Sequence, residues 1–260
     1  QWSKGEYPGA NQTQDDIAII TGKLMLRPDD HGQTRTTATP LSMTNAGVVT
    51  SVTPVTAPGA PASKANRGVL GTRADVDVFA FTVSNAGIVN LNVLPAWRDS
   101  FMATSLRSAN LDIRASLFRD NGTPAGVLVT QSNPAADTFA AVQANVSPGH
   151  YLLRIEGIGA GTLATGYSDY GSLGQYFISG RVPQPALRTV SVSTPVAAQG
   201  TVAGGGSFPI GTLRTVTATP KTGFTFVRWT KGGVQVSTAR AYSFVLNANT
   251  SLVAHFAVGT

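Results

Sequence analysis

The amino-acid sequence predicts an all-β chain, and three observations carry that prediction. Leu, Val, Ile and Phe recur in short bursts separated by Gly, Pro, Asn and Asp, which is the pattern of strands and turns. No stretch sustains the 3.6-residue period of an amphipathic helix. The length of 260 residues suits one large or two smaller domains, each able to bury a core. We therefore expect little helix.

Composition argues against an enzyme and against a membrane-spanning chain. The sequence has no cysteine, three scattered histidines and only 12% charged residues. Catalysis needs clustered titratable groups or metal ligands, and no such cluster is visible. No apolar run approaches the 18 or more residues of a membrane span. The missing cysteines fit either a reduced compartment or a bacterial exoprotein that is stabilised by packing alone.

The positive charge raises the question of nucleic-acid binding. The formal net charge is +6 and the pI is about 9.9, from 19 Lys and Arg against 13 Asp and Glu. We interpret these residues as spread along the whole length, whereas nucleic-acid binders usually concentrate them on one face, often with aromatic residues interleaved. The sequence thus predicts a dilute positive surface and no nucleic-acid partner.

The first clear strand runs over residues 75–83. Its alternation places Val76 and Val78 on one face and Phe79, Phe81 and Val83 on the other, so both faces are apolar and the strand should lie centrally. A turn at Gly87 predicts a hairpin with the next strand, residues 88–94.

The following strands complete a β-sandwich of about 110 to 150 residues. A strand over residues 111–117 ends near Asn121-Gly122, a dipeptide that favours the tight type I′ turn of a hairpin. Pro148-Gly149 marks a turn before the strand 151–155, and residues 175–182 form the last strand.

Prolines and changes in composition along the chain predict four segments. Residues 1–33 look like the tail of an earlier domain followed by a linker, and residues 34–182 form the sandwich. The prolines of VPQPALR make residues 183–188 a short stiff linker. Residues 189–260 form a smaller β unit with Trp229 in its core. The opening QWSKGEYPG is not a signal peptide, so we expect the chain to begin within a longer protein or after processing.

The opening segment QWSKGEYPGANQTQDDIAII resembles the end of the catalytic domain of secreted reprolysin-like (metzincin) zinc proteases. The resemblance implies a parent protease whose active site lies upstream of Gln1. A metzincin zinc site needs two histidines one helical turn apart with a glutamate beside the first. Because His31, His150 and His255 are isolated in the sequence, we expect no zinc site and no catalytic residue within this chain.

Two further resemblances cover most of the chain. DDHGQT, RADVDVFAFTV, NLDIRASLFRDNG, SPGHYLLRIEGIG and YGSLGQYFISGRV, in this order, resemble the bacterial pre-peptidase C-terminal domain, which implies a jelly-roll-like β-sandwich beside a secreted protease. TVAGGGSFPIGTLRTVTATPKTGFTFVRWT and YSFVLNANTSLVAHFA are similar to the divergent internalin-type B repeat, which implies a small β-rich, β-grasp-like module. Both resemblances imply a secreted or cell-surface bacterial protein.

Five carboxylates are candidate ligands for calcium, which prefers six to eight oxygen atoms. Paired acidic residues at strand edges often supply such oxygens, and relatives of the sandwich include calcium-binding members. The alternative is that Asp75 and Asp77 point to solvent or cap a turn where their strand starts. The candidate ligands are Asp29, Asp30, Asp75, Asp77 and Asp112.

Two loops are candidate ligand-binding surfaces. Tyr, Ser and Gly make the loop GYSDYGSLG an adaptable contact surface, although its tyrosines could instead pack on the rim of the sandwich. The loop PAWRDSFMATSLRSAN carries apolar aromatic residues that need a binding or packing partner, and it could instead form a short helix over the open end of the sandwich. The candidate residues of the two loops are Trp97, Arg98, Phe101, Met102, Tyr167, Asp169 and Tyr170.

These observations predict a non-catalytic accessory region of a secreted zinc metalloprotease. Its partners would be the upstream protease domain and an extracellular protein or polysaccharide, and its work would be substrate or matrix binding, secretion or stability. Two alternatives stay open. The chain could be a surface adhesin or stalk that binds protein or glycan, or an autoprocessed C-terminal product that acts by itself. The sequence predicts no oligomeric state.

Overall fold

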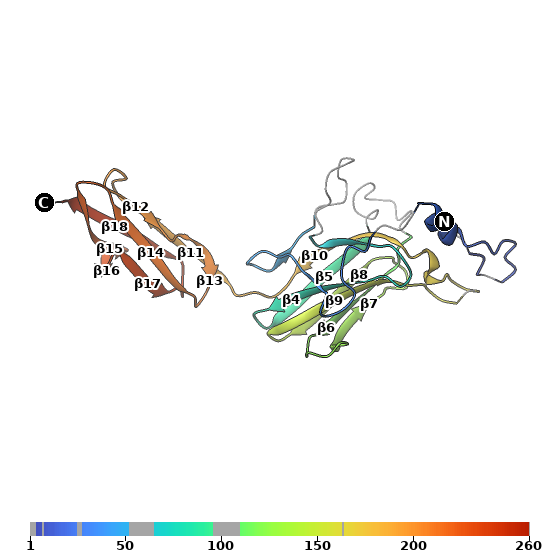
Figure 1. Ribbon diagram of the computed structural model, residues 1–260. Helices are drawn as coiled ribbons and strands as arrows, with labels where there is room; N and C mark the ends of the chain where they lie inside the picture. The colour runs from blue at the N-terminus through green and yellow to red at the C-terminus, as the bar shows by residue number, and fades with distance from the viewer. Residues whose placement is uncertain are drawn as a thin grey trace. The chain divides into compact units, whose positions relative to one another are not determined.

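In a computed structural model the chain divides into two compact units, Gln1–Gln184 and Pro185–Thr260 (Figure 1). The structure describes residues 4–6, 8–24, 28–51, 65–95, 110–162 and 164–259. The first unit contains α1 (Asp16–Leu24), β1 (Thr39–Pro40), β2 (Val48–Val49), β3 (Arg67–Leu70), β4 (Val76–Val83), β5 (Gly87–Pro95), β6 (Ile113–Arg119), β7 (Val127–Ser132), β8 (Ala140–Val146), β9 (Gly149–Gly157), the 3-10 helix η1 (Asp169–Gly171) and β10 (Gly174–Arg181). Neither helix has the length and apolarity needed to cross a membrane, as far as the described residues show.

The first unit is a sandwich of two sheets around one apolar core. One sheet has the strand order β1-β4-β9-β6-β7, and the other has the order β2-β10-β5-β8 with β3 also paired to β10. Inward residues of both sheets form the core, among them Phe79 and Leu117 from the first sheet and Leu91 and Ile178 from the second. Burial of alternate residues is what holds two such sheets face to face.

The predicted hairpin at Gly87 is wrong, because β4 and β5 lie in different sheets. β4 pairs with β9, whereas β5 pairs with β8 and β10. Both strands turn a fully buried apolar face to the core, Phe79 on β4 and Val89 on β5. The chain crosses from one sheet to the other between these strands, and Phe79 and Val89 enter the shared core from opposite sheets.

β6 and β7 form the predicted antiparallel hairpin, but the connection is longer than a two-residue turn. Arg119 pairs with Val127, so residues 120–126 make the loop. The side chain of Asp120 accepts a hydrogen bond from the amide of Gly122 at 2.9 Å, and the side chain of Asn121 accepts one from the amide of Thr123 at 3.1 Å. These side-chain turns compete with the type I′ geometry that Asn-Gly favours.

The second unit also has two sheets. Its strands are β11 (Leu187–Ser193), β12 (Gly200–Ala203), β13 (Gly206–Pro209), β14 (Leu213–Pro220), β15 (Phe224–Lys231), β16 (Val234–Ser237), β17 (Ala241–Val245) and β18 (Thr250–Val258). The sheet orders are β13-β11-β18-β15-β16 and β12-β14-β17. The prediction that Trp229 lies in the core is confirmed, since the residue is fully buried and its Nε1 donates to the carbonyl of Arg240 at 3.3 Å.

The chain is therefore mostly β, with a sandwich followed by a smaller β unit. The jelly-roll-like and β-grasp-like assignments of the two units remain predictions.

Candidate functional site

The register of β4 carries a carboxylate into the core of the sandwich. Successive side chains of a strand point to opposite faces, and Asp77 is in phase with the buried Phe79, Phe81 and Val83. Asp77 is 0% exposed, and Asp75, just before the strand, is 7% exposed. The alternative in which these two carboxylates point to solvent is therefore wrong.

The segment before the first strand brings two more carboxylates to the same place. His31 is buried and anchors this segment: its ring lies 4.6 Å from the ring of Phe79, and its Nε2 lies 2.6 Å from the carbonyl oxygen of Arg67. The amide of Val78 on β4 also donates to the carbonyl of Gly32 at 3.0 Å. These contacts hold Asp29 and Asp30 beside β4.

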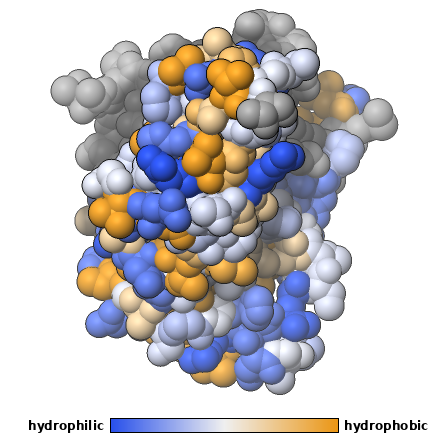
Figure 2. Space-filling model, turned by 90° about the vertical axis from the view of Figure 1, so that its left-hand side faces the viewer, coloured by the Kyte–Doolittle hydropathy of each residue, from blue (hydrophilic) through white to orange (hydrophobic). Residues whose placement is uncertain are grey.

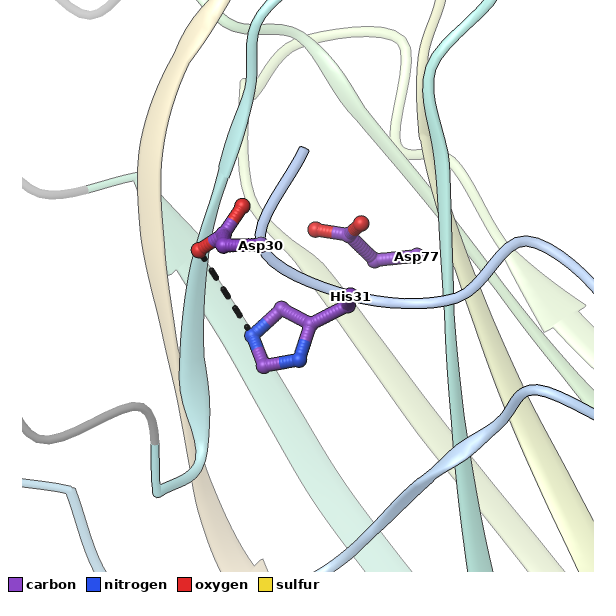
Figure 3. A group of neighbouring side chains, drawn as sticks. All are labelled: Asp30, His31 and Asp77. Atoms are coloured by element: carbon purple, nitrogen blue, oxygen red, sulfur yellow. Dashed lines mark ion pairs between the residues drawn. The ribbon is translucent and has the colours of Figure 1, made fainter. Parts of the chain in front are cut away.

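Two overlapping groups of possible metal ligands result. One oxygen from each of Asp29, Asp75 and Asp77 lies within 4.8 Å of the others, and the same holds for ligand atoms of Asp30, His31 and Asp77. In Figure 3 the carboxylate of Asp77 points toward Asp30, and the dashed line marks the 3.7 Å approach of the Asp30 carboxylate to His31.

Two buried carboxylate oxygens in this cluster have no hydrogen-bond partner among the residues that the structure describes. The Oδ2 atom of Asp75 accepts from the amide of Gly71 at 2.7 Å, and the Oδ2 atom of Asp77 accepts from the hydroxyl of Tyr176. The Oδ1 atom of each residue is buried and unpaired. Since buried polar atoms are almost always satisfied, an unpaired pair of this kind points to a ligand.

Glycine is needed at position 68 for the same packing. A Cβ atom there would lie 2.4 Å from the hydroxyl of Tyr176 and 2.7 Å from the Oδ2 of Asp77. Gly68 therefore lets β3 approach closely enough for Tyr176 to reach Asp77, which fixes one oxygen of that carboxylate and leaves the other directed to the cluster.

The electrostatics of the cluster favour a proton or a cation. Burial raises the pKa of Asp77 to about 7, the hydrogen bond from Tyr176 opposes the rise, and the charges of the other three carboxylates add to it. Burial also raises the pKa of Asp75, against the hydrogen bond from the amide of Gly71. A bound cation would stabilise the charged carboxylates that burial and mutual repulsion disfavour.

The donor set fits a hard, oxygen-binding cation such as Ca²⁺. Both ring nitrogens of His31 are engaged, Nε2 with Arg67 and Nδ1 with the hydroxyl of Thr39 at 2.8 Å. The imidazole is thus not free to bind a metal, and the donors that remain are carboxylate oxygens, which suit Ca²⁺ and not the nitrogen and sulfur sites typical of zinc.

Asp112, the fifth candidate ligand, stands outside both groups. It precedes β6, which is separated from β4 by β9. Its Oδ2 accepts from the hydroxyl of Tyr167 at 2.8 Å, its Oδ1 is buried and unpaired, and burial raises its pKa. Asp112 therefore provides a buried carboxylate of similar chemistry away from the cluster.

The loop with Tyr167, Asp169 and Tyr170 is engaged within the chain. Besides the contact of Tyr167 with Asp112, Asp169 pairs with Arg73. The buried Tyr170 donates to the carboxylate of Asp15 at 2.7 Å, and its hydroxyl accepts from the amide of Ile17 at 2.8 Å. The hydrogen bond from Tyr170 also lowers the pKa of Asp15. This loop thus fastens the N-terminal segment to the sandwich.

The candidate aromatic loop with Trp97, Arg98, Phe101 and Met102 lies outside the described residues. Its binding role remains a prediction. The role of His31 and Tyr176 in arranging the acidic cluster was not predicted from the sequence. Only the position of His31 directly after Asp29-Asp30, and of Tyr176 in an alternating strand, could have pointed to them.

The architecture is that of two β modules in tandem, one of which holds an acidic cluster. Residues 190–260 match the family described as the Divergent InlB B-repeat domain. Among solved structures, the chain is similar to the pre-peptidase C-terminal domain of collagenase from Bacillus anthracis, with a TM-score of 0.29 and 17% sequence identity, over 44% of this chain and 83% of that chain. No curated protein matches the chain. These are the two kinds of domain that the sequence resembles.

Replacing Asp77 by Asn should separate ion binding from the effect of the buried charge. In chelator at about pH 8, D77N should raise the melting temperature, because removing a carboxyl whose pKa is raised by about three units relieves on the order of 2–4 kcal/mol. The same variant should lose the rise in melting temperature that Ca²⁺ gives the wild type. Calorimetric titration and thermal melts in Ca²⁺ and in chelator measure both effects.

The matched control is D112N. It also removes a buried carboxylate of raised pKa, so it should stabilise the protein in chelator, but it should keep the response to Ca²⁺. An unchanged Ca²⁺ response in D77N would contradict the site.

The response to Ca²⁺ should depend on pH. The folded-state pKa of Asp77, about 7, lies above its ordinary value, so the protonated form stabilises the fold at low pH and this contribution is lost as pH rises through about 7. A cation must displace that proton, so the Ca²⁺-induced rise in melting temperature should be largest at about pH 8 and much smaller at about pH 5. Melts across this range test it, and a difference that does not change with pH would argue against Asp77 as a ligand.

The anchoring role of Tyr170 predicts a local effect. Tyr170→Phe removes the hydroxyl that binds Asp15 and Ile17, so amide exchange at the start of α1 should become roughly fivefold faster. Tyr167→Phe, in the same loop, should leave α1 unchanged. Hydrogen–deuterium exchange with mass spectrometry compares the two variants, and equal exchange in both would rule out a specific anchor.

Proposed function

We propose that the chain is a non-catalytic accessory region of a secreted bacterial zinc metalloprotease, in which a Ca²⁺ ion fastens the segment before the sandwich to the sandwich itself. The observation that carries the proposal is the pair of buried, unpaired oxygens of Asp75 and Asp77 opposite the carboxylates of Asp29 and Asp30. The resemblance of the first residues to the end of a metzincin catalytic domain supports a zinc metalloprotease as the parent.

The ion would act as a joint between two parts of the chain. Asp29 and Asp30 belong to the segment that precedes the sandwich, whereas Asp75 and Asp77 belong to β4 and the turn before it. Without a cation, four carboxylates repel one another across this junction. With Ca²⁺, the same groups attract a shared charge, so the path of the preceding segment becomes fixed. Extracellular modules commonly bind Ca²⁺ at about 0.1–1 mM, which is where a secreted protein would meet it.

The accessory role follows from what such a joint does. A fixed connection holds the sandwich in a defined direction downstream of a catalytic domain, and the region can then bind a large extracellular protein or polysaccharide. It also adds the free energy of ion binding to the stability of the exported protein by mass action. Secretion, substrate binding and stabilisation are thus the three contributions that we assign to this region.

Deleting residues 34–260 from the parent protein tests the accessory role. Activity on a large insoluble protein should fall by about tenfold or more, because the enzyme loses its effective concentration at the surface, while activity on a short soluble peptide should stay within about twofold. Removing Ca²⁺ should reproduce part of the loss on the insoluble substrate.

Equal losses on both substrates would mean that the region serves folding and not substrate binding. The coding sequence upstream of Gln1 gives the second check. A helix with two histidines four residues apart and a glutamate beside the first would establish the protease, and its absence would favour the surface adhesin.

A further inference from the structure

The charge of this chain is divided unevenly between its two units. Residues 1–184 contain 13 Lys and Arg and 13 Asp and Glu, whereas residues 185–260 contain six Lys and Arg and no Asp or Glu. The Lys and Arg residues are thus spread along the whole length, as interpreted above, whereas the Asp and Glu residues are confined to the first unit. The entire net charge of +6 belongs to the second unit. Its six cations are Arg188, Arg214, Lys221, Arg228, Lys231 and Arg240.

None of these cations can form an ion pair with a side chain of its own unit, because that unit has no acidic residue. Lys221, Arg228, Lys231 and Arg240 are exposed. Unpaired like charges on a small domain repel one another and lower its stability, and they create a positive field that draws in anions. An anionic partner would relieve the repulsion.

One arginine packs on an aromatic ring, and a second arginine lies on the strand that pairs with the strand of that ring. The guanidinium of Arg214 lies 3.5 Å from the centre of the Phe208 ring, and Arg188 on β11 is the cross-strand partner of Phe208 on β13. The Nε atom of Arg214 is buried and has no hydrogen-bond partner. The ring therefore holds one guanidinium in place and leaves part of its donor capacity unused, with a second arginine on the neighbouring strand.

The outer faces of both sheets of the second unit carry exposed hydroxyl groups. On the outer face of the three-stranded sheet, Thr201 pairs with Thr219, and the hydroxyls of Thr215 and Ser243 lie 2.8 Å apart. On the five-stranded sheet, the exposed Ser191 pairs with the exposed Ser251. Hydroxyls donate and accept hydrogen bonds without adding charge, which suits the hydroxyl groups of sugars.

The aromatic side chains argue against nucleic acid as the partner. Proteins that bind single strands stack bases on exposed aromatic rings. In this unit Trp229 and Phe256 are buried, and each of the other five aromatic residues is at least half-buried. Phe208, Phe226, Tyr242 and Phe244 pack against the core. The cations thus lack the stacking surface that usually accompanies them in a nucleic-acid site.

A membrane surface is also a poorer fit. Interfacial binding combines cations with a continuous apolar face. On the face that Figure 2 shows, hydrophobic and hydrophilic residues are interspersed and the hydrophobic ones do not merge into one broad area.

We infer that the second unit binds an anionic polysaccharide, a glycan chain that carries carboxylate, sulfate or phosphate groups. Its cations neutralise the anionic groups, and the exposed Thr and Ser hydroxyls of the same unit bind the sugar hydroxyls. This inference rests on the proposed accessory role and names the chemical class of the polymer that the region binds.

The test measures binding of the full chain to immobilised dextran sulfate and polygalacturonate, with neutral dextran as reference. We expect binding to both anionic polymers and none to dextran, with an affinity that falls steeply between about 50 and 200 mM salt. The two anionic polymers distinguish sulfate from carboxylate recognition. A short DNA duplex and anionic phospholipid vesicles complete the set, and tighter binding to either of these would overturn the inference.

Charge variants locate the site. R228Q/K231Q/R240Q, which removes three exposed cations of the second unit, should weaken binding by roughly tenfold or more. The matched control K23Q/R119Q/R181Q removes three exposed cations of the first unit and should change the affinity by no more than about twofold. Equal weakening in both variants would mean that net charge alone attracts the polymer, and the inference would fail.

A conservative variant distinguishes the loss of charge from a loss of folding. R228K/R240K keeps the charge and should bind like the wild type, and a loss as large as that of the glutamine variant would overturn the charge mechanism. None of these substitutions touches the acidic cluster, so the Ca²⁺-dependent melting of the first unit should be unchanged in all of them. Failure of polymer binding therefore leaves the proposed calcium joint standing, and failure of the joint leaves the polymer test valid.

Discussion

The sandwich depends on the alternation of β4, which directs every second side chain into the core. One of these side chains is a carboxylate. Phe79, Phe81 and Val83 must face inward, and with them goes Asp77, two residues earlier in the same phase. Three neighbouring parts of the structure are arranged around the two carboxylate oxygens of Asp77. Tyr176 reaches across from β10, position 68 is a glycine to let it pass, and the segment around His31 folds over the same spot. A carboxylate in an apolar core is strongly disfavoured when it is charged and unpaired, which is why the cluster is the chemically active part of the unit.

Much of the architecture was predictable from the sequence, since the strand bursts, the hairpin of β6 and β7 and the buried Trp229 all follow from local patterns. The pairing of the strands was not predictable from the sequence. Alternation predicts that β4 and β5 are strands but not that they lie in different sheets, because their sheets are defined by pairing with β8, β9 and β10, which are distant in the sequence. The acidic cluster was predictable only as a set of residue types. Asp29 and Asp30 reach Asp75 and Asp77 through the contacts of His31 with Phe79 and Arg67, and such long-range packing leaves no periodic signal in the sequence.

The two units use charge in opposite ways. In the first unit acidic and basic residues are equal in number, many of them in ion pairs such as Arg114 with Glu156, and its unusual feature is a local excess of negative charge inside the fold. In the second unit no negative side chain exists, and the excess is positive and mostly at the surface. A buried anionic cluster selects a small, hard cation that fits among its oxygens, whereas a surface array of cations suits a long flexible anion that can contact several of them in turn.

The first and last strands of the second unit, β11 and β18, are hydrogen-bonded neighbours that run parallel, from Val190 opposite Thr250 to Ser193 opposite Val253. The chain therefore enters this unit at one end of the pair and leaves it toward the other. A pulling force applied through the two strands acts along their length and loads the hydrogen bonds between them together, as shear. In an antiparallel pair pulled from one end, the bonds would instead open one after another. The topology of this small unit is thus suited to carry mechanical tension applied between the start of β11 and the end of β18.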